Sequence, residues 1–259
     1  MRLTGRFIHR ARVLAPLTVA AALALPAAAS AASFPLQAWW PLAEGKGQVI
    51  KDWSGRGHDG FLGSTPGPDV NDPTWVKGVF FGAALRFDGV NDFAQVPDSA
   101  DLHPQQLTVS LWFRGSGSPG PYKYLLARGG DACVSASYGL ETDFNGGLSF
   151  YTWDGTQQHF SGLMGPEIWD GKWHHAAGTW DGVTARLFVD GKELPHSSNF
   201  PGTIDYTGPT GPTTLGGYHA GCDLLFTGDI DQVMIWSTPL PVADIWAKLS
   251  VLFNRPGIQ

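Results

Sequence analysis

The chain has 259 residues, of which 34 are Gly and 19 are Pro, and its 15 Phe, 11 Trp and 6 Tyr can anchor a large core. This turn-rich composition argues against a helical bundle, and 43% hydrophobic against 15% charged residues excludes an intrinsically disordered chain. The net charge of −6 argues against nucleic acid and anionic membranes as partners, because affinity for both rests on clustered Lys and Arg.

The first 31 residues are typical of a secretory signal peptide. Four arginines accompany an apolar stretch at 13–26, and small residues follow at 27–32. The apolar stretch is shorter than the roughly 20 residues of a membrane helix, so we expect no membrane insertion. Cleavage after Ala31 would remove four arginines and leave a secreted, extracellular chain with a net charge of about −10.

From residue 36 onward, short apolar stretches alternate with turn signals at intervals of roughly ten residues. Asp-Gly pairs at Asp88, Asp181 and Asp190 supply the positive φ that hairpin turns need. We therefore predict strands at 36–40, 84–87, 93–96, 107–114, 124–128, 134–141, 148–153, 173–180, 184–189 and 232–236.

Only residues 241–253 have a helical pattern, with Ile245, Leu249 and Leu252 on one face, so we expect one short helix near the C-terminus. The spacing of strands and turns does not break along the chain. The sequence therefore predicts a single all-β domain over residues 32–259, with a core at about 36–253.

Four segments resemble, in order, the LamG-like jelly-roll domains of the concanavalin A-like lectin/glucanase superfamily. They lie at 52–60 (DWSGRGHDG), 84–93 (ALRFDGVNDF), 173–191 (WHHAAGTWDG, then LFVDG) and 226–240 (FTGDIDQVMIWSTPL). The resemblance implies two antiparallel sheets packed face to face as a jelly-roll sandwich. It does not fix the function, because this fold carries lectins, adhesion modules, glycosidases, lyases and spacer domains.

The chain has two cysteines, Cys133 and Cys222, and both lie in the predicted mature domain. In an oxidising compartment such a pair favours a disulfide over two free thiols. The bridge would close a loop of about 90 residues and stabilise the domain by roughly 4 to 5 kcal/mol on the chain-entropy model.

Acidic residues suggest a calcium ion. Asp229 and Asp231 alternate, so on a strand their carboxylates share one face and repel each other unless a cation or a base lies between them. In the domains that this chain resembles, the residues matching Asp52 and Asp231 converge on a structural calcium ion, with Asp229 and Asn91 or Asp92 as further neighbours. The alternative is that these acids accept backbone N–H groups in turns without any metal.

Catalytic motifs are weak. Glycosidases of this fold resemble one another in a Glu-x-Asp-x-x-Glu motif, but the stretch from Glu141 to Asp143 lacks the second glutamate, which favours solvent-facing acids at the end of a hairpin. His174 and His175 are adjacent, so on a strand they point to opposite faces and do not form a joint site. Three glycines at 55, 57 and 60 match a dinucleotide fingerprint in spacing only, and we expect a turn there.

Sugar binding needs aromatic platforms beside polar groups, and the hairpin at 148–160 offers both. We name Tyr138, Tyr151, Trp153 and His159 as candidate sugar-binding residues. The sequence thus favours a secreted, non-catalytic, lectin-like module that binds a polysaccharide or a glycosylated surface. A polysaccharide hydrolase or lyase, or a protein-binding or structural surface domain, stays open as an alternative.

Overall fold

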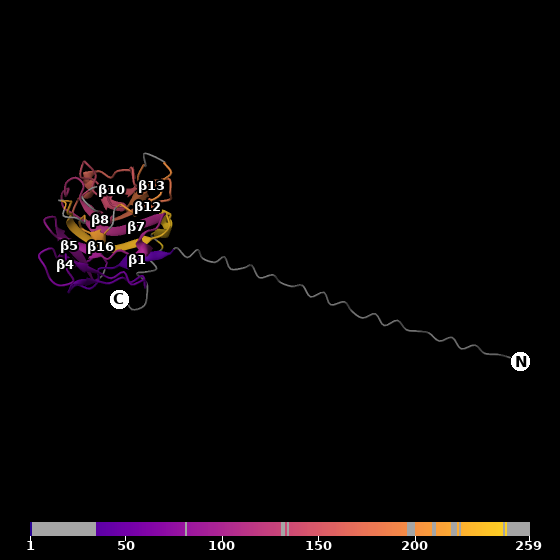
Figure 1. The fold of residues 1–259 in the computed structure, drawn as a ribbon, viewed down its shortest axis with the longest axis horizontal. Coiled ribbons are helices and arrows are strands. Elements are labelled where there is room, and N and C mark those ends of the chain that lie inside the picture. The colour runs from indigo at the N-terminus through magenta and orange to yellow at the C-terminus, as the bar shows by residue number, and fades with distance from the viewer. Residues whose placement is uncertain are drawn as a thin grey trace. The chain divides into compact units, whose positions relative to one another are not determined.

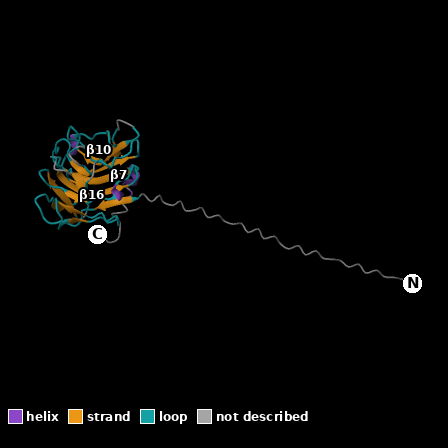
Figure 2. Cartoon of the chain, viewed as in Figure 1, coloured by secondary structure: helices purple, strands orange, loops and turns teal. Residues whose placement is uncertain are grey.

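The computed structural model describes Met1 and residues 35–80, 82–130, 133, 135–195, 200–208, 211–218, 222, 224–245 and 247. Strands dominate these residues (Figure 2), and two single 3-10 turns interrupt them, η1 (Ala100–Leu102) and η2 (Pro166–Ile168). In the described part of the chain, no helix is long and apolar enough to cross a membrane.

The first sheet, called sheet A, is antiparallel and has the order β14-β13-β12-β7-β16-β5-β4, with β1 paired to β16 as well. Figure 1 shows β13, β12, β7 and β16 following one another across it. Its strands are β1 (Leu36–Trp40), β4 (Thr74–Lys77), β5 (Ala83–Asp88), β7 (Leu107–Arg114), β12 (His174–Trp180), β13 (Ala185–Val189), β14 (Lys192–Glu193) and β16 (Thr227–Trp236).

The second sheet, sheet B, is antiparallel as well, with the order β11-β10-β9-β8-β15-β6-β3-β2. Its strands are β2 (Val49–Ile50), β3 (Gly60–Leu62), β6 (Ala94–Val96), β8 (Tyr124–Arg128), β9 (Tyr138–Glu141), β10 (Ser149–Trp153), β11 (Gln158–Phe160) and β15 (Thr213–Leu215). The two sheets form the expected jelly-roll sandwich, which confirms the predicted fold class.

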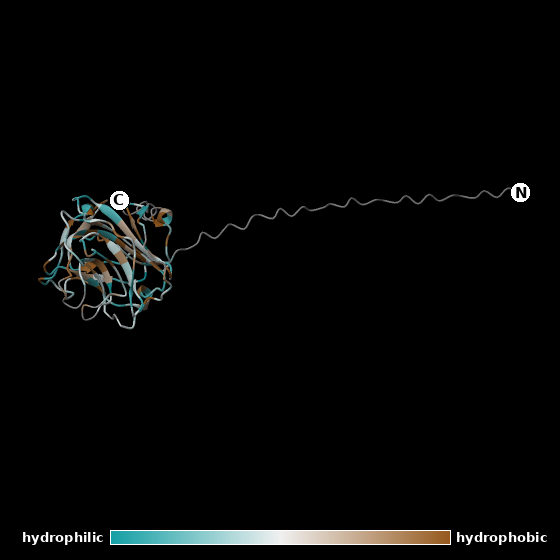
Figure 3. Ribbon diagram, turned by 90° about the horizontal axis from the view of Figure 1, so that it is seen from above, coloured by the Kyte–Doolittle hydropathy of each residue, from teal (hydrophilic) through white to brown (hydrophobic). Residues whose placement is uncertain are grey.

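The largest hydrophobic cluster takes side chains from both sheets. In β7 the inward positions Leu107, Val109, Leu111 and Phe113 alternate with outward ones, and all four are buried. Sheet B contributes Leu140 and other inward residues, and apolar (brown) residues recur along the strands in Figure 3. Each such side chain stabilises the fold by about 1.5 to 3 kcal/mol, so the alternation visible in the sequence fixes which face of each strand meets the other sheet.

A second, smaller cluster lies on the outer face of sheet A. Trp39, Met234 and Trp236 point away from the main core there and pack against Leu240 and Ile245. These last two residues belong to the segment after β16, where residues 242–245 and 247 are helical. The C-terminal helix therefore begins where the sequence predicts it, and the remainder of the predicted range 241–253 lies outside the described residues.

Strand β16 has a bulge between Asp231 and Met234. Gln232 adopts a φ of 51° there, and its side chain accepts a hydrogen bond from Trp39 Nε1 (3.2 Å) and donates one to Pro41 O (3.2 Å). Before the bulge, β16 pairs with β5, and after it with β1. The bulge thus lets one edge of β16 serve two strands in succession.

All ten predicted strands are present, with ends that differ by a few residues. The main differences are that β16 begins at Thr227 instead of residue 232, and that β9 begins at Tyr138 instead of residue 134. Among the described residues, six strands of two to four residues were not in the predicted set, β2, β3, β4, β11, β14 and β15, although β11 is the return strand of the predicted hairpin at 148–160. These strands are too short to show an alternation of apolar and polar residues. The predicted range for β16 began too late because its first residues include Gly and Asp, which are rare in strands.

Candidate functional site

The outer face of sheet B combines aromatic and acidic side chains. Alternation along β10 turns Phe150 into the core and places Tyr151 in a separate cluster with Tyr124, Ala127, Ala136 and Tyr218. The Tyr124 and Tyr151 hydroxyls lie 2.8 Å apart, and Tyr151 also accepts a hydrogen bond from Ala136 N (3.0 Å). These contacts hold the aromatic rings in fixed positions.

Beside this cluster is an open cavity of about 420 Å³. Four of its lining residues are exposed and largely apolar: Tyr122, Phe144, Phe160 and Leu163. Buried polar residues line it as well, Glu141 from β9, Ser149 from β10, and Asp143 and Ser161 from the following loops. Ser149 Oγ is buried and has no hydrogen-bond partner within the described residues.

Glu141 is the most perturbed group of this cavity. It is only 3% exposed, and this burial raises the pKa of its carboxyl to about 7, although a hydrogen bond with Tyr124 acts in the opposite direction. Asp143 is buried too, and its Oδ1 accepts hydrogen bonds from Asn145 N (2.7 Å) and Gly147 N (2.9 Å). The expectation that both acids face solvent was therefore wrong, because the end of this hairpin folds back over them.

The four predicted sugar-binding residues do not form one site. Tyr138 is fully buried between the sheets and donates a hydrogen bond to Leu102 O (3.2 Å). His159 is buried against Trp180, and its Nε2 lies 2.8 Å from Asp154 Oδ2. Tyr151 and Trp153 do lie on the outer face of sheet B, and Trp153 is partly exposed. Successive residues of a strand point to opposite faces of the sheet, which explains why Tyr138 and His159 point inward while Tyr151 and Trp153 point outward.

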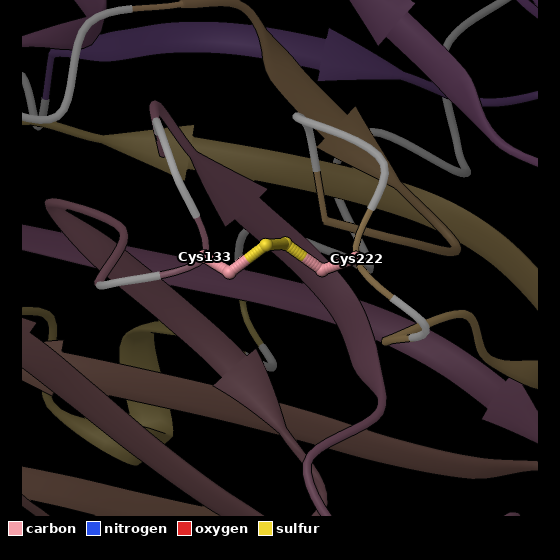
Figure 4. Close-up of a disulfide and its surroundings, with 2 residues drawn as sticks. All are labelled: Cys133 and Cys222. Carbon is pink, nitrogen blue, oxygen red and sulfur yellow. A yellow bond between two sulfur atoms is a disulfide. The ribbon is translucent and has the colours of Figure 1, made fainter.

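Cys133 and Cys222 form a disulfide, as expected, with their Cα atoms 5.9 Å apart (Figure 4). Cys133 follows β8 and Cys222 follows β15, so the bridge links two loops that come from neighbouring strands. Cys222 packs against the Tyr124, Tyr151 and Tyr218 cluster. The disulfide therefore supports the same face of sheet B that carries the cavity.

Asp52 organises the loop between β2 and β3. Its carboxylate accepts hydrogen bonds from Trp39 N (3.0 Å), Ser54 N (2.8 Å) and His58 N (2.9 Å), and one from Ser54 Oγ (2.7 Å). Burial acts to raise the pKa of Asp52, but these hydrogen bonds outweigh it and lower the pKa. Gly55 and Gly57 have φ values of 87° and 83° in this loop, so their motif is a turn, as predicted.

Asp229 and Asp231 find different partners. Asp229 lies between two guanidinium groups, with Arg86 Nε 2.7 Å from Oδ1 and Arg114 Nε 2.9 Å from Oδ2. Asp231 accepts hydrogen bonds from Val79 N (2.8 Å) and Gln232 N (2.8 Å), and burial raises its pKa to about 8. The two arginines thus supply Asp229 with the basic partners that the sequence left open as the alternative to a cation, whereas Asp231 is held by backbone N–H groups.

The candidate calcium ligands are distributed over separate contacts. Asn91 donates from its amide to Val70 O and to Asn71 Oδ1, and Asp92 accepts from Asp88 N (3.0 Å). Among the described residues, no group of three or more His, Cys, Asp or Glu side chains is arranged to hold a metal ion. Asp52, Asp229, Asp231 and Asn91 each have hydrogen-bond partners among the described residues.

His174 and His175 face opposite sides of sheet A, as predicted. His174 lies between Asp190 (2.7 Å) and Asp170 (3.0 Å); burial acts to lower its pKa, but these two partners raise it. His175 is buried with its ring against Trp112, and burial lowers its pKa to about 4. Neither histidine belongs to the cavity of sheet B.

Three residues of this cavity were not among the predicted site residues: Phe144, Phe160 and Leu163. The period of two could have indicated only Phe160, which lies two residues after Gln158 on β11, so that both side chains point to the outer face of sheet B. Phe144 and Leu163 lie in loops, where no periodicity predicts the direction of a side chain.

Solved structures share this fold. Domain 4 of an extracellular arabinanase from Geobacillus stearothermophilus, in complex with arabinotriose, matches with a TM-score of 0.61 and 18% identity, over 82% of this chain and 96% of that one. The binding domain of Paraclostridial Mosquitocidal Protein 1 matches with a TM-score of 0.63 and 15% identity, over 85% and 53%. A Trypanosoma rangeli sialidase matches with a TM-score of 0.54 and 18% identity, over 80% and 31%.

No curated protein sequence matches the chain. A family model described as the concanavalin A-like lectin/glucanases superfamily, of the laminin G type, matches residues 88–246, which is more than half of the chain. This range runs from β5 to the helical segment after β16 and includes strands of both sheets. The chain therefore belongs to the concanavalin A-like lectin/glucanase superfamily.

Proposed function

We propose that the chain is a secreted, non-catalytic module that binds carbohydrate at the cavity on the outer face of sheet B. The observation that carries this proposal is the combination of exposed aromatic rings, Tyr122, Phe144 and Phe160, with buried polar groups in one 420 Å³ cavity. A sugar ring offers an apolar C–H face to such rings and hydroxyl groups to such polar atoms.

The buried groups suit hydroxyl recognition in particular. Glu141 can accept a hydrogen bond when ionised and donate one when protonated. The arabinanase domain of the same fold, whose structure contains arabinotriose, gives a precedent for oligosaccharide binding.

A polysaccharide hydrolase or lyase is the second candidate, and the raised pKa of Glu141 favours it. A glycosidase needs two carboxyl groups free to act on the substrate. The described contacts commit Asp143 Oδ1 to two backbone N–H groups, which favours binding over catalysis. An assay for newly released reducing ends, or for unsaturated products, on each polysaccharide that binds would detect the enzyme.

The test is affinity electrophoresis and calorimetry of residues 32–259 against plant, microbial and animal polysaccharides. We expect retention by at least one neutral polysaccharide and a loss of affinity of about fivefold or more for Phe160→Ala, because stacking and burial of one aromatic ring contribute on the order of 1 to 3 kcal/mol. Phe200→Ala is the matched control, since Phe200 is also exposed but does not line the cavity. Equal affinity of both variants and the parent would place the binding site elsewhere.

Stabilisation by calcium belongs to the proposal as a separate expectation, supported by the family resemblance. Thermal melts in calcium and in excess chelator would test it, with Asp52→Asn and Asp231→Asn as variants. A melting temperature that is the same in both conditions would leave Asp52 with its structural role alone. Binding of a polysaccharide could persist in that case, so the two parts fail separately.

A further inference from the structure

A second cavity, of about 450 Å³, opens beside the neighbouring strands β5, β16 and β7 of sheet A. It is lined by Arg86, Arg114 and Asp229 and by the hydroxyl-bearing residues Ser116, Ser118 and Thr227. None of the residues that line the cavity of sheet B takes part in it. It is therefore a separate feature of the molecule.

Three charged residues form one row across three neighbouring strands. Asp229 on β16 is in register with Arg86 on β5 and with Arg114 on β7. Asp229 is 2% exposed, whereas the side chains of Arg86 and Arg114 are 54% and 31% exposed. Two guanidinium groups against one carboxylate leave the row with one positive charge, in a chain whose net charge is −6.

The contacts to Asp229 hold both guanidinium groups in place and leave donors unused. Arg86 uses Nε and Nη2 on Asp229, and Arg114 uses the same two atoms. The guanidinium of Arg114 also lies 4.8 Å from the centre of the Trp173 ring, which restricts it further. Within the described residues, the Nη1 atom of each arginine has no hydrogen-bond partner.

We propose that this cavity binds the carboxylate of an acidic saccharide, with Arg86 and Arg114 as the residues that recognise it. Preorganised guanidinium groups match the planar geometry of a carboxylate. The remainder of the ligand would meet hydroxyl groups and glycine backbone, since the cavity lining contains four glycines and only two apolar side chains, Phe87 and Pro119. Such a lining suits a polyhydroxylated sugar ring better than the apolar side chain at a peptide terminus.

The test uses isothermal titration of the protein with trigalacturonate and 3′-sialyllactose at physiological salt. Galactotriose and lactose serve as the uncharged counterparts. We expect binding of at least one acidic sugar and a loss of affinity of about tenfold or more for Arg86→Gln, because a hydrogen bond to a charged group is worth on the order of 1.5 to 3 kcal/mol. Arg186→Gln is the matched control, since Arg186 is 29% exposed and paired with Asp181 and Glu193 at a different place.

Thermal melts identify any variant that fails to fold, and Arg86→Gln then decides alone because its side chain is mostly exposed. The proposal is overturned if neither acidic sugar binds, if Arg86→Gln binds as the parent does, or if a C-terminal carboxylate peptide binds as tightly as the sugars.

Discussion

Removal of the disulfide gives the most quantitative test of this structure. The bridge between Cys133 and Cys222 spans 89 residues of sequence, so on the chain-entropy model it stabilises the folded state by roughly 4 to 5 kcal/mol. For a domain of about 220 residues, that corresponds to a fall in melting temperature of roughly 10 to 20 °C. We expect this loss in the double variant Cys133→Ala/Cys222→Ala.

Equilibrium unfolding in urea, followed by tryptophan fluorescence, measures the change. The slope of the unfolding free energy against urea should rise in the variant, because an unbridged chain exposes more surface when it unfolds. Parent protein treated with a reducing agent should match the variant, and the variant should not respond to the agent. A loss below about 1 kcal/mol with an unchanged slope would refute the entropic argument and indicate that packing of the two loops alone holds them together.

Three further substitutions test individual contacts. Burial raises the pKa of Glu141 to about 7 in the folded state, whereas an unfolded Glu titrates near 4.5. The unfolding free energy of the parent relative to Glu141→Gln should therefore fall by up to about 3 kcal/mol as pH rises between these values, and stay level below pH 4. A difference in urea unfolding that is flat across this range would contradict the burial argument. The two aspartates raise the pKa of His174, so its ion pairs stabilise the fold below the unfolded pKa of about 6.5 and lose this effect as pH rises. In urea unfolding, the parent should therefore be more stable than His174→Gln at pH 5.5 but not at pH 9. Gly178→Ala should cost on the order of 2 kcal/mol or more, because the new Cβ would lie 2.2 Å from the Phe150 ring; a melting temperature equal to the parent's would show that Phe150 moves freely.

The long strands could be predicted from the sequence because their residues obey one rule. In β7 each apolar residue at odd positions from Leu107 to Phe113 meets the other sheet, and no local exception occurs. The same period placed Tyr151 and Trp153 on one face, but it could not say whether that face lay inside or outside the sandwich. Tyr138 shows the consequence, since an inward position removes it from any ligand.

The polar residues were harder to predict, because their partners are distant in sequence. Asp229 meets Arg86 across 143 residues and Arg114 across 115, so neither pairing leaves a local signal. Glu141 interacts with Tyr124 of the neighbouring strand and shares its cavity with the loop residues Phe144 and Leu163, and loops have no period that would place them. Asp52 was the exception, because the Asp-x-Ser-Gly turn that it organises is local and its hydrogen bonds to Ser54 follow from the spacing.

The position of β16 has a consequence for the way this domain is made. Strand β16 lies between β7 and β5, and its second half also pairs with β1, the first strand of the described residues, so that Trp39 meets Gln232 across 193 residues. Sheet A therefore lacks an interior strand until residue 236 has left the ribosome, and its two ends cannot join before then. Closure of sheet A should therefore come after the strands of sheet B have emerged, with slow kinetics set by these long-range pairings.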